Sequence, residues 1–129
     1  MGKIISFANQ KGGVGKTTSA VNTAASLGIL GYKTLIIDLD PQGNATSGVG
    51  VVKKTLKSSI YDVLMEEVEP EDAIVKTSFE NLSIIPSNIA LANAEINLFH
   101  YEGEKEYVMR DALNKIKDRF DYIIIDCPP

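Results

Sequence analysis

The chain has 129 residues, of which 44% are hydrophobic and 23% are charged. This length and composition fit one ordinary globular domain and exclude a disordered tail, a fibrous repeat and a disulfide-stapled miniprotein. The net charge of −4 gives no compositional sign of nucleic-acid binding, and the one cysteine favours a reducing, cytoplasmic setting. No apolar run reaches the roughly 18 residues that a membrane span needs.

Short apolar runs rich in isoleucine alternate with helical patterns along the chain. Buried parallel strands are predicted at 3–8, 34–38 and 122–126, with a fourth strand candidate at 82–86. Helices are predicted at 16–30, 60–66, 70–76, 90–99 and 106–120. Gly31 stands where a C-cap glycine belongs after the first helix. The alternation predicts an α/β fold with an open, mostly parallel sheet flanked by helices.

The segment between the first strand and the first helix reads NQKGGVGKTT, from Asn9 to Thr18. This is the context that a phosphate-binding loop requires. Glycines let successive backbone N–H groups turn toward an anion, and the helix N-terminus adds further donors. Lys16 can reach the β- and γ-phosphates of a nucleotide, and Thr17 places a hydroxyl where it can ligate Mg²⁺. The residues expected to bind the phosphates are Gly12, Gly13, Val14, Gly15, Lys16, Thr17 and Thr18.

One position departs from the usual phosphate-loop pattern, because Gln10 stands where a glycine is expected. The segment instead matches a deviant pattern, Lys-Gly-Gly-Xaa-Gly-Lys-Thr, with an additional lysine at Lys11. It resembles the ParA/MinD ATPases with a deviant Walker A motif, and among these the ParA/Soj partitioning proteins. The resemblance implies an ATP-sandwich homodimer, in which Lys11 reaches the partner's phosphates and neutralises transition-state charge.

Two carboxylates, Asp38 and Asp40, follow the second strand. Residues two apart in an extended segment face the same way, and open parallel sheets bind ligands beyond their C-terminal strand ends. Mg²⁺ would let the two neighbouring carboxylates stay charged, whereas an Asx-type turn at Asp-Pro is the alternative interpretation. The segment DLDPQGNAT resembles the ParA switch I segment. The resemblance implies that Asp40 orients or deprotonates the attacking water and that Asp38 lies in the Mg²⁺ shell.

The third apolar run ends in Asp126, which is the Walker B arrangement. A buried strand holds its terminal carboxylate rigidly beside the Mg²⁺ site, usually through a water, although many strands end in aspartate. Cys127 is expected to be a small filler beside the site. The basic cluster of Lys53, Lys54 and Lys57 is expected to be a solvated face, with weak DNA contact as the alternative. Because the chain stops directly after this strand, residues 1–129 are expected to be the N-terminal portion of a single P-loop ATPase domain.

The resemblance to ParA/Soj proteins implies Mg²⁺-dependent ATP hydrolysis used as a switch in chromosome or plasmid partitioning. It also implies a ParB-type partner that triggers hydrolysis, a cytoplasmic and nucleoid-associated location, and no membrane association. Non-specific DNA binding is expected of the full-length protein and not of this piece. Three alternatives stay open: a MinD-like membrane-cycling ATPase, a carboxylate-activating relative of the cobyrinic acid a,c-diamide synthase type, and an inactive truncated fragment. The Pro-Gln-Gly-Asn sequence after the aspartates favours the partitioning branch.

Overall fold

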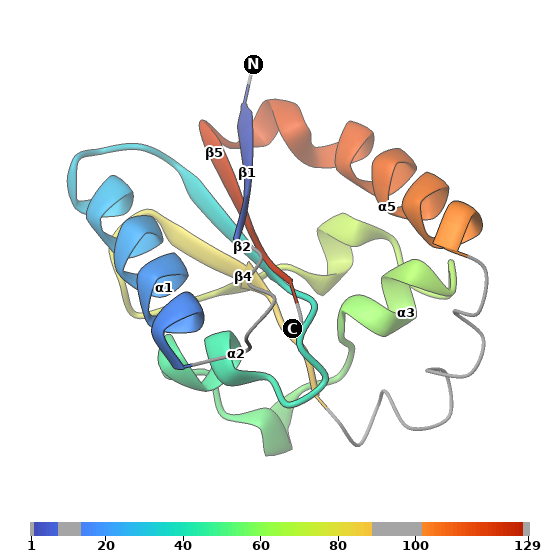
Figure 1. The fold of residues 1–129 in the computed structure, drawn as a ribbon, viewed down its shortest axis with the longest axis horizontal. Coiled ribbons are helices and arrows are strands. Elements are labelled where there is room, and N and C mark those ends of the chain that lie inside the picture. Colours follow the sequence, from blue (N-terminus) through green and yellow to red (C-terminus); the bar gives the residue numbers. More distant parts are fainter. Residues whose placement is uncertain (1, 8–13, 89–101, 128–129) are drawn as a thin grey trace.

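The computed structural model describes residues 2–7, 14–88 and 102–127. Residues 9–13 of the predicted phosphate loop, which include Lys11, Gly12 and Gly13, lie outside the described residues, as does the helix predicted at 90–99. The described part is an α/β fold with a five-stranded sheet flanked by helices (Figure 1).

The sheet has the strand order β1-β5-β2-β4-β3 and is parallel except at β3. Its strands are β1 (Lys3–Phe7), β2 (Thr34–Asp38), β3 (Val75–Lys76), β4 (Leu82–Ile85) and β5 (Tyr122–Asp126). The four longer strands were all predicted, and parallel pairing places their C-terminal ends along one side of the sheet. Asp38 and Asp126 are neighbours in the register of β2 and β5.

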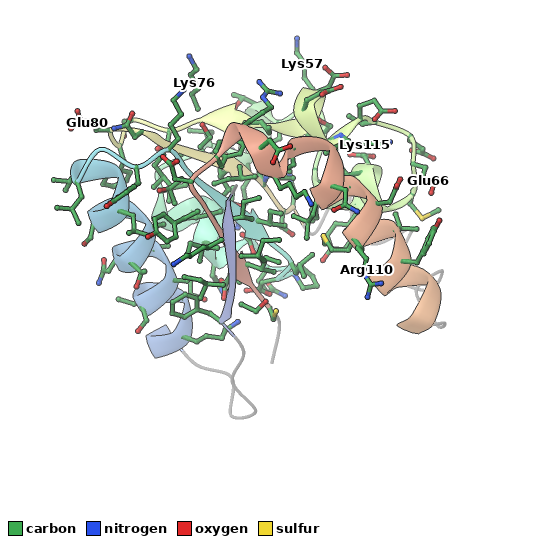
Figure 2. All side chains as sticks on the ribbon, turned by 90° about the horizontal axis from the view of Figure 1, so that it is seen from above. Lys57, Glu66, Lys76, Glu80, Arg110 and Lys115 are labelled. Atoms are coloured by element: carbon green, nitrogen blue, oxygen red, sulfur yellow. The ribbon has the colours of Figure 1, made fainter. Side chains whose placement is uncertain are left out.

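Helices cover both faces of the sheet, with α1 on one side and α5 on the other (Figure 2). The α-helices are α1 (Val14–Ile29), α2 (Asn44–Gly48), α3 (Ile60–Leu64) and α5 (Glu102–Ile116). Three 3₁₀ turns complete the described elements: η1 (Lys53–Thr55), η2 (Pro70–Ala73) and η4 (Lys117–Arg119). No helix in the described residues is long and apolar enough to cross a membrane.

The apolar side chains of the central strands alternate between two cores. Leu35 and Ile37 of β2 pack with α3 and α5, whereas Ile36 packs with α1 and α2. Residues of a strand point alternately to opposite faces, so a continuous isoleucine run supplies both cores at once. Each fully buried side chain of this size contributes roughly 1.5–3 kcal/mol, and together they hold the end of β2 rigidly below the site.

The first strand differs from the prediction, because β1 is exposed instead of buried. Ile4 is 45% exposed and Ile5 is 38% exposed, although adjacent residues of a strand face opposite sides. The reason is that β1 is the outermost strand, paired with β5 along one edge. Figure 2 shows β1 between α1 and α5 with no described helix over it.

Other differences concern short elements. The segment predicted as a helix at 70–76 forms a single 3₁₀ turn, η2, followed by the short strand β3 antiparallel to β4. Ile74, Val75 and Thr77 are β-branched and favour extended backbone, which ends the turn. The five-residue helix α2 was not predicted, and α5 begins four residues before the predicted start. Gly31 has a positive φ of 96°, which confirms the predicted C-cap.

Candidate active site

Two aspartates lie side by side at the C-terminal ends of the central strands. Asp38 ends β2 and Asp126 ends β5, and neither is exposed to solvent. Burying a carboxylate is costly unless it is paired or hydrogen-bonded, so their partners show what each one does. The first turn of α1 supplies the partners of Asp126, and the segment after β2 supplies those of Asp38.

Asp126 contacts two residues of the predicted phosphate loop. The Nζ atom of Lys16 lies 2.8 Å from Asp126 Oδ1, and the hydroxyl of Thr17 donates to Asp126 Oδ2 at 3.0 Å. Lys16 is 9% exposed and also donates to the carbonyl of Cys127. Among the described residues, Asp126 Oδ1 accepts no aligned hydrogen bond, so the charge of Lys16 is what compensates it. The structure therefore brings together Lys16, Thr17 and Asp126, which are three of the predicted site residues.

Asp38 is held by three hydrogen-bond donors from its own segment and α2. Thr46 donates to Asp38 Oδ2 from its backbone N at 2.9 Å and from its hydroxyl at 2.8 Å. The backbone N of Asp40 donates to Asp38 Oδ1 at 3.0 Å. The Thr46 hydroxyl oxygen also accepts from the backbone N of Ser87 at 2.9 Å, which ties α2 to the end of β4. Burial raises the pKa of Asp38 to about 6, although the hydrogen bonds from Thr46 and Asp40 oppose the rise.

Asp40 is 8% exposed and accepts a hydrogen bond at each carboxylate oxygen. The backbone N of Gln42 donates to Oδ1 at 3.0 Å, and the Asn44 side-chain Nδ2 donates to Oδ2 at 2.8 Å. The first of these bonds is an Asx turn, which the sequence offered as the alternative to a functional carboxylate. In the structure the turn holds one carboxylate oxygen and the Asn44 amide holds the other, so the turn does not argue against a functional role.

Several contacts hold the turn after Asp40 in place. Gly43 has a φ of 67°, and an added Cβ would lie 2.6 Å from the Ser87 carbonyl oxygen. Lys53 donates from Nζ to the carbonyl of Gln42 at 2.5 Å, so it is partly buried and structural, whereas a solvated face was expected. The Tyr61 hydroxyl donates to the carbonyl of Leu39 at 3.1 Å, and burial raises the pKa of Tyr61 to about 12.

Within the described part of the chain, the start of α1 is open at Gly15. Val14 is its first residue, and an added Cβ at Gly15 would meet no described atom within 4 Å. Gly15 and Thr18 are exposed in this turn, whereas Lys16 is buried between them. Exposed N–H groups in the first turn of a helix suit a phosphate, which the backbone approaches most closely where no side chain intervenes.

The oxygen atoms of the site suit a magnesium ion that also has ligands from a nucleotide. Among the described residues, no group of three or more His, Cys, Asp or Glu side chains could hold a metal by itself. Mg²⁺ in nucleotide sites commonly has one or two protein oxygens and takes its other ligands from phosphates and water. The Thr17 hydroxyl and the Asp126 carboxylate fit this pattern. Both Asp38 oxygens already accept hydrogen bonds from the protein, which suits a role through a bound water.

Sequence reasoning missed the residues that position the aspartates. Asn44 and Thr46 both lie in the segment that resembles switch I, but no role was assigned to either. Periodicity and motif spacing do not reveal which donors a buried carboxylate meets. The local signal available for Asn44 was an amide side chain four residues after Asp40 in a turn-rich segment.

Comparison with known families and sequences identifies the chain's relatives. The AAA_31 family, described as an AAA domain, matches residues 2–129. The sporulation initiation inhibitor protein Soj of Bacillus subtilis is 50% identical over 129 residues, which are all of this chain and 51% of Soj. The chromosome partitioning protein ParA of Myxococcus xanthus is 43% identical over all of this chain and 45% of its own length. The chain thus spans about half the length of these relatives.

Solved structures agree with the fold. The cobyrinic acid a,c-diamide synthase of Mycobacterium smegmatis, with bound ATP analog and magnesium, superposes with a TM-score of 0.89 at 43% identity. This chain is covered completely, against 52% of the synthase. The cell division ATPase MinD of Pyrococcus furiosus gives a TM-score of 0.78 at 33% identity, over 99% of this chain and 51% of MinD.

Proposed function

Because the chain belongs to the AAA_31 family, we propose that it is the nucleotide-binding part of a ParA/Soj-type, Mg²⁺-dependent ATPase. The observation that carries the proposal is the meeting of Lys16, Thr17 and Asp126, whose motifs stand 109 residues apart in the sequence. A lysine, a hydroxyl and a buried strand-end carboxylate are the protein groups that P-loop enzymes use around the terminal phosphates.

The proposed chemistry starts with an exchange of partners at Lys16. When ATP binds, Lys16 leaves Asp126 for the β- and γ-phosphates, which carry more negative charge than one carboxylate. The backbone at Gly12, Gly13, Val14 and Gly15, with Thr18, binds the phosphate oxygens. Thr17 would hold Mg²⁺, with Asp38 and Asp126 acting through water. The ion neutralises charge on the phosphates.

Asp40 is proposed to direct the attacking water. The water oxygen bonds to the γ-phosphorus while the bond from that phosphorus to the β–γ bridging oxygen breaks, giving ADP and phosphate. Asp40 accepts a hydrogen bond from the water and so aims its oxygen. Asp40 suits this role because its carboxylate is held at both oxygens by groups of its own segment.

The functions of the whole protein are proposed from its relatives. Lys11 acts in trans across an ATP-dependent homodimer, and a ParB-type partner stimulates hydrolysis. The full-length protein binds DNA without sequence preference, in the cytoplasm and on the nucleoid, and takes part in chromosome or plasmid partitioning. Residues 1–129 are the N-terminal portion of its single P-loop domain and bind DNA negligibly by themselves. The resemblance to Soj over the whole chain supports this branch.

A second candidate is an enzyme that uses ATP to activate a substrate carboxylate. The similarity to the cobyrinic acid a,c-diamide synthase favours this candidate. The sequence identity to the synthase is 43%, the same as the identity to the ParA of Myxococcus xanthus. A MinD-like ATPase is favoured less, because the identity is 33%. Substrate-stimulated ADP formation without any effect of DNA would support the amidation alternative over partitioning.

The proposal is tested by calorimetric titration of this chain with ADP and ATP in the presence of Mg²⁺. Weak binding is expected in the wild type and is expected to fall below detection in Lys16→Ala, since the phosphate loses its cation. In the full-length protein, phosphate release should require Mg²⁺ and rise with DNA and a ParB-type partner. The proposal would be overturned if neither this chain nor the full-length protein bound nucleotide.

A further inference from the structure

Asp40 is held by two partners of different kinds. The backbone N of Gln42 fixes Oδ1 within the Asx turn, and the Asn44 side chain fixes Oδ2. The carbonyl of Asp40 also accepts from the backbone N of Gly43 at 2.8 Å, so the main chain around the turn is closed. Of these contacts, the Asn44 amide is the one made by a side chain, and it determines how the carboxylate plane is rotated.

The chemistry of the pair fixes which atom of Asn44 faces the carboxylate. An ionised carboxylate only accepts hydrogen bonds, whereas an amide offers one donating and one accepting end. Turning the amide over would place two oxygens 2.8 Å apart, so Nδ2 must face Asp40 Oδ2. Asn44 is exposed and begins α2, so it can act on Asp40 without being part of the core.

We propose that Asn44 is a positioning residue for hydrolysis, which holds the Asp40 carboxylate at the rotation needed to aim the attacking water. This inference rests on the proposed ATPase function. Both carboxylate oxygens then keep one lone pair for the protein and one for the water. Asn44 touches neither nucleotide nor metal in this account, so it sets the rate of the chemical step and leaves nucleotide affinity unchanged.

The structure separates Asn44 from the residues that hold the rest of the site. Thr46, two residues further along α2, serves Asp38, and Lys53 holds the carbonyl of Gln42. Removing the Asn44 side chain leaves these contacts and the Asx turn in place. The carboxylate of Asp40 would then rotate about its last bond with a single remaining hydrogen bond, to Gln42. Small losses of alignment at a reacting centre cost up to about 100-fold in rate.

The test compares Asn44→Ala with Ser47→Ala, an exposed position in the same helix. In the full-length protein we expect kcat for ATP hydrolysis to fall about 10- to 100-fold in Asn44→Ala, with KM and the Kd for Mg²⁺–ADP within about twofold of the wild type. Ser47→Ala should match the wild type in all three. Asn44→Gln keeps an amide donor and should hydrolyse ATP faster than Asn44→Ala.

Three results would overturn the assignment. Asn44→Ala could hydrolyse ATP as fast as Ser47→Ala, it could lose affinity for ADP in step with its rate, or Asn44→Gln could be no faster than Asn44→Ala. The second result would show that Asn44 supports only the local structure. A wild-type protein that binds no nucleotide is a different failure, since it overturns the proposed ATPase function before any variant is compared.

Discussion

Asp38 and Asp126 occupy equivalent positions at the ends of adjacent strands, and both are fully buried, yet they are satisfied in different ways. Asp38 receives three hydrogen bonds from neutral groups, all within eight residues of it in the sequence. Asp126 of β5 is paired with Lys16 and Thr17 of helix α1. In the described part of the chain, one of its carboxylate oxygens has no aligned hydrogen-bond donor.

This difference separates a fixed carboxylate from an exchangeable one. Thr46 cannot leave Asp38 without disturbing the fold, because its hydroxyl also accepts a hydrogen bond from the backbone N of Ser87 and thereby joins α2 to the end of β4. The partners of Asp126 are the residues expected to bind phosphate and Mg²⁺, so a ligand can take them over. The two carboxylates are buried to the same depth but held by different groups: Asp38 by its own segment and α2, and Asp126 by residues proposed to bind phosphate and Mg²⁺.

The largest effect is expected from Lys16→Met. This change leaves the buried carboxylate of Asp126 without its cation, which typically costs about 3–5 kcal/mol of unfolding free energy. Urea denaturation measures the loss. Adding Asp126→Asn should restore more than half of it, because the unpaired charge is gone. A loss below about 1 kcal/mol in Lys16→Met would contradict the pairing.

The next largest effect is a pH dependence of the unfolding free energy that is caused by Asp38. Its pKa rises from 3.8 to about 6 on folding, so between these values the folded protein keeps a proton that the unfolded chain has released. The unfolding free energy should therefore fall as pH rises from about 4 to 6, by up to about 3 kcal/mol at 1.4 kcal/mol per unit of pKa. Urea denaturation without Mg²⁺ tests this, and Asp38→Asn should remove that part of the slope. An equal slope in both proteins would contradict it.

A smaller loss is expected from Thr46→Val, which keeps the shape of the side chain but removes its hydroxyl. Asp38 loses one donor and the backbone N of Ser87 loses its acceptor, for an expected cost of about 2 kcal/mol. Thr46→Ser retains both hydrogen bonds and serves as the control. Thermal and urea unfolding should rank the proteins wild type, Thr46→Ser, Thr46→Val. Equal stability of the two variants would show that the hydroxyl does not hold Asp38.

The smallest effect is expected at Lys53, whose hydrogen bond to Gln42 lies near the surface. Lys53→Met should cost about 1 kcal/mol, whereas Lys54→Met, at an exposed neighbouring position, should cost less than about 0.5 kcal/mol. The same unfolding measurement compares the two. If Lys53→Met costs as little as Lys54→Met, the basic cluster is a solvated face, as its sequence suggested.

Much of the fold and the chemical identity of the site could be predicted from the sequence. Isoleucine runs bounded by polar residues mark the central strands because they must be buried on both faces. A phosphate loop and a Walker B strand were predicted on one parallel sheet, and the structure brings Lys16 and Thr17 of the loop to Asp126 of the strand. Each of these inferences rests on a pattern that is local to one segment.

The parts that could not be predicted depend on position within the sheet or on contacts across it. The exposure of Ile4 and Ile5 follows from β1 being the edge strand, and apolar composition does not distinguish an edge strand from a central one. The role of Thr46 depends on Ser87, which is 41 residues further along the chain. The short helix α2 is stabilised by these contacts and has little helical propensity of its own.

The contrast between the two buried aspartates is tested most directly by carbon-detected NMR of the aspartate side-chain carboxyl groups, before and after addition of Mg²⁺–ADP. The account predicts that the Asp126 carboxyl signal moves well beyond its linewidth, because Lys16 and Thr17 leave it for the ligand. The Asp38 carboxyl signal should move much less, because Thr46 and Asp40 keep their hydrogen bonds to it. A saturating ligand that shifts Asp38 as much as Asp126, or that leaves Asp126 unmoved, would contradict the account.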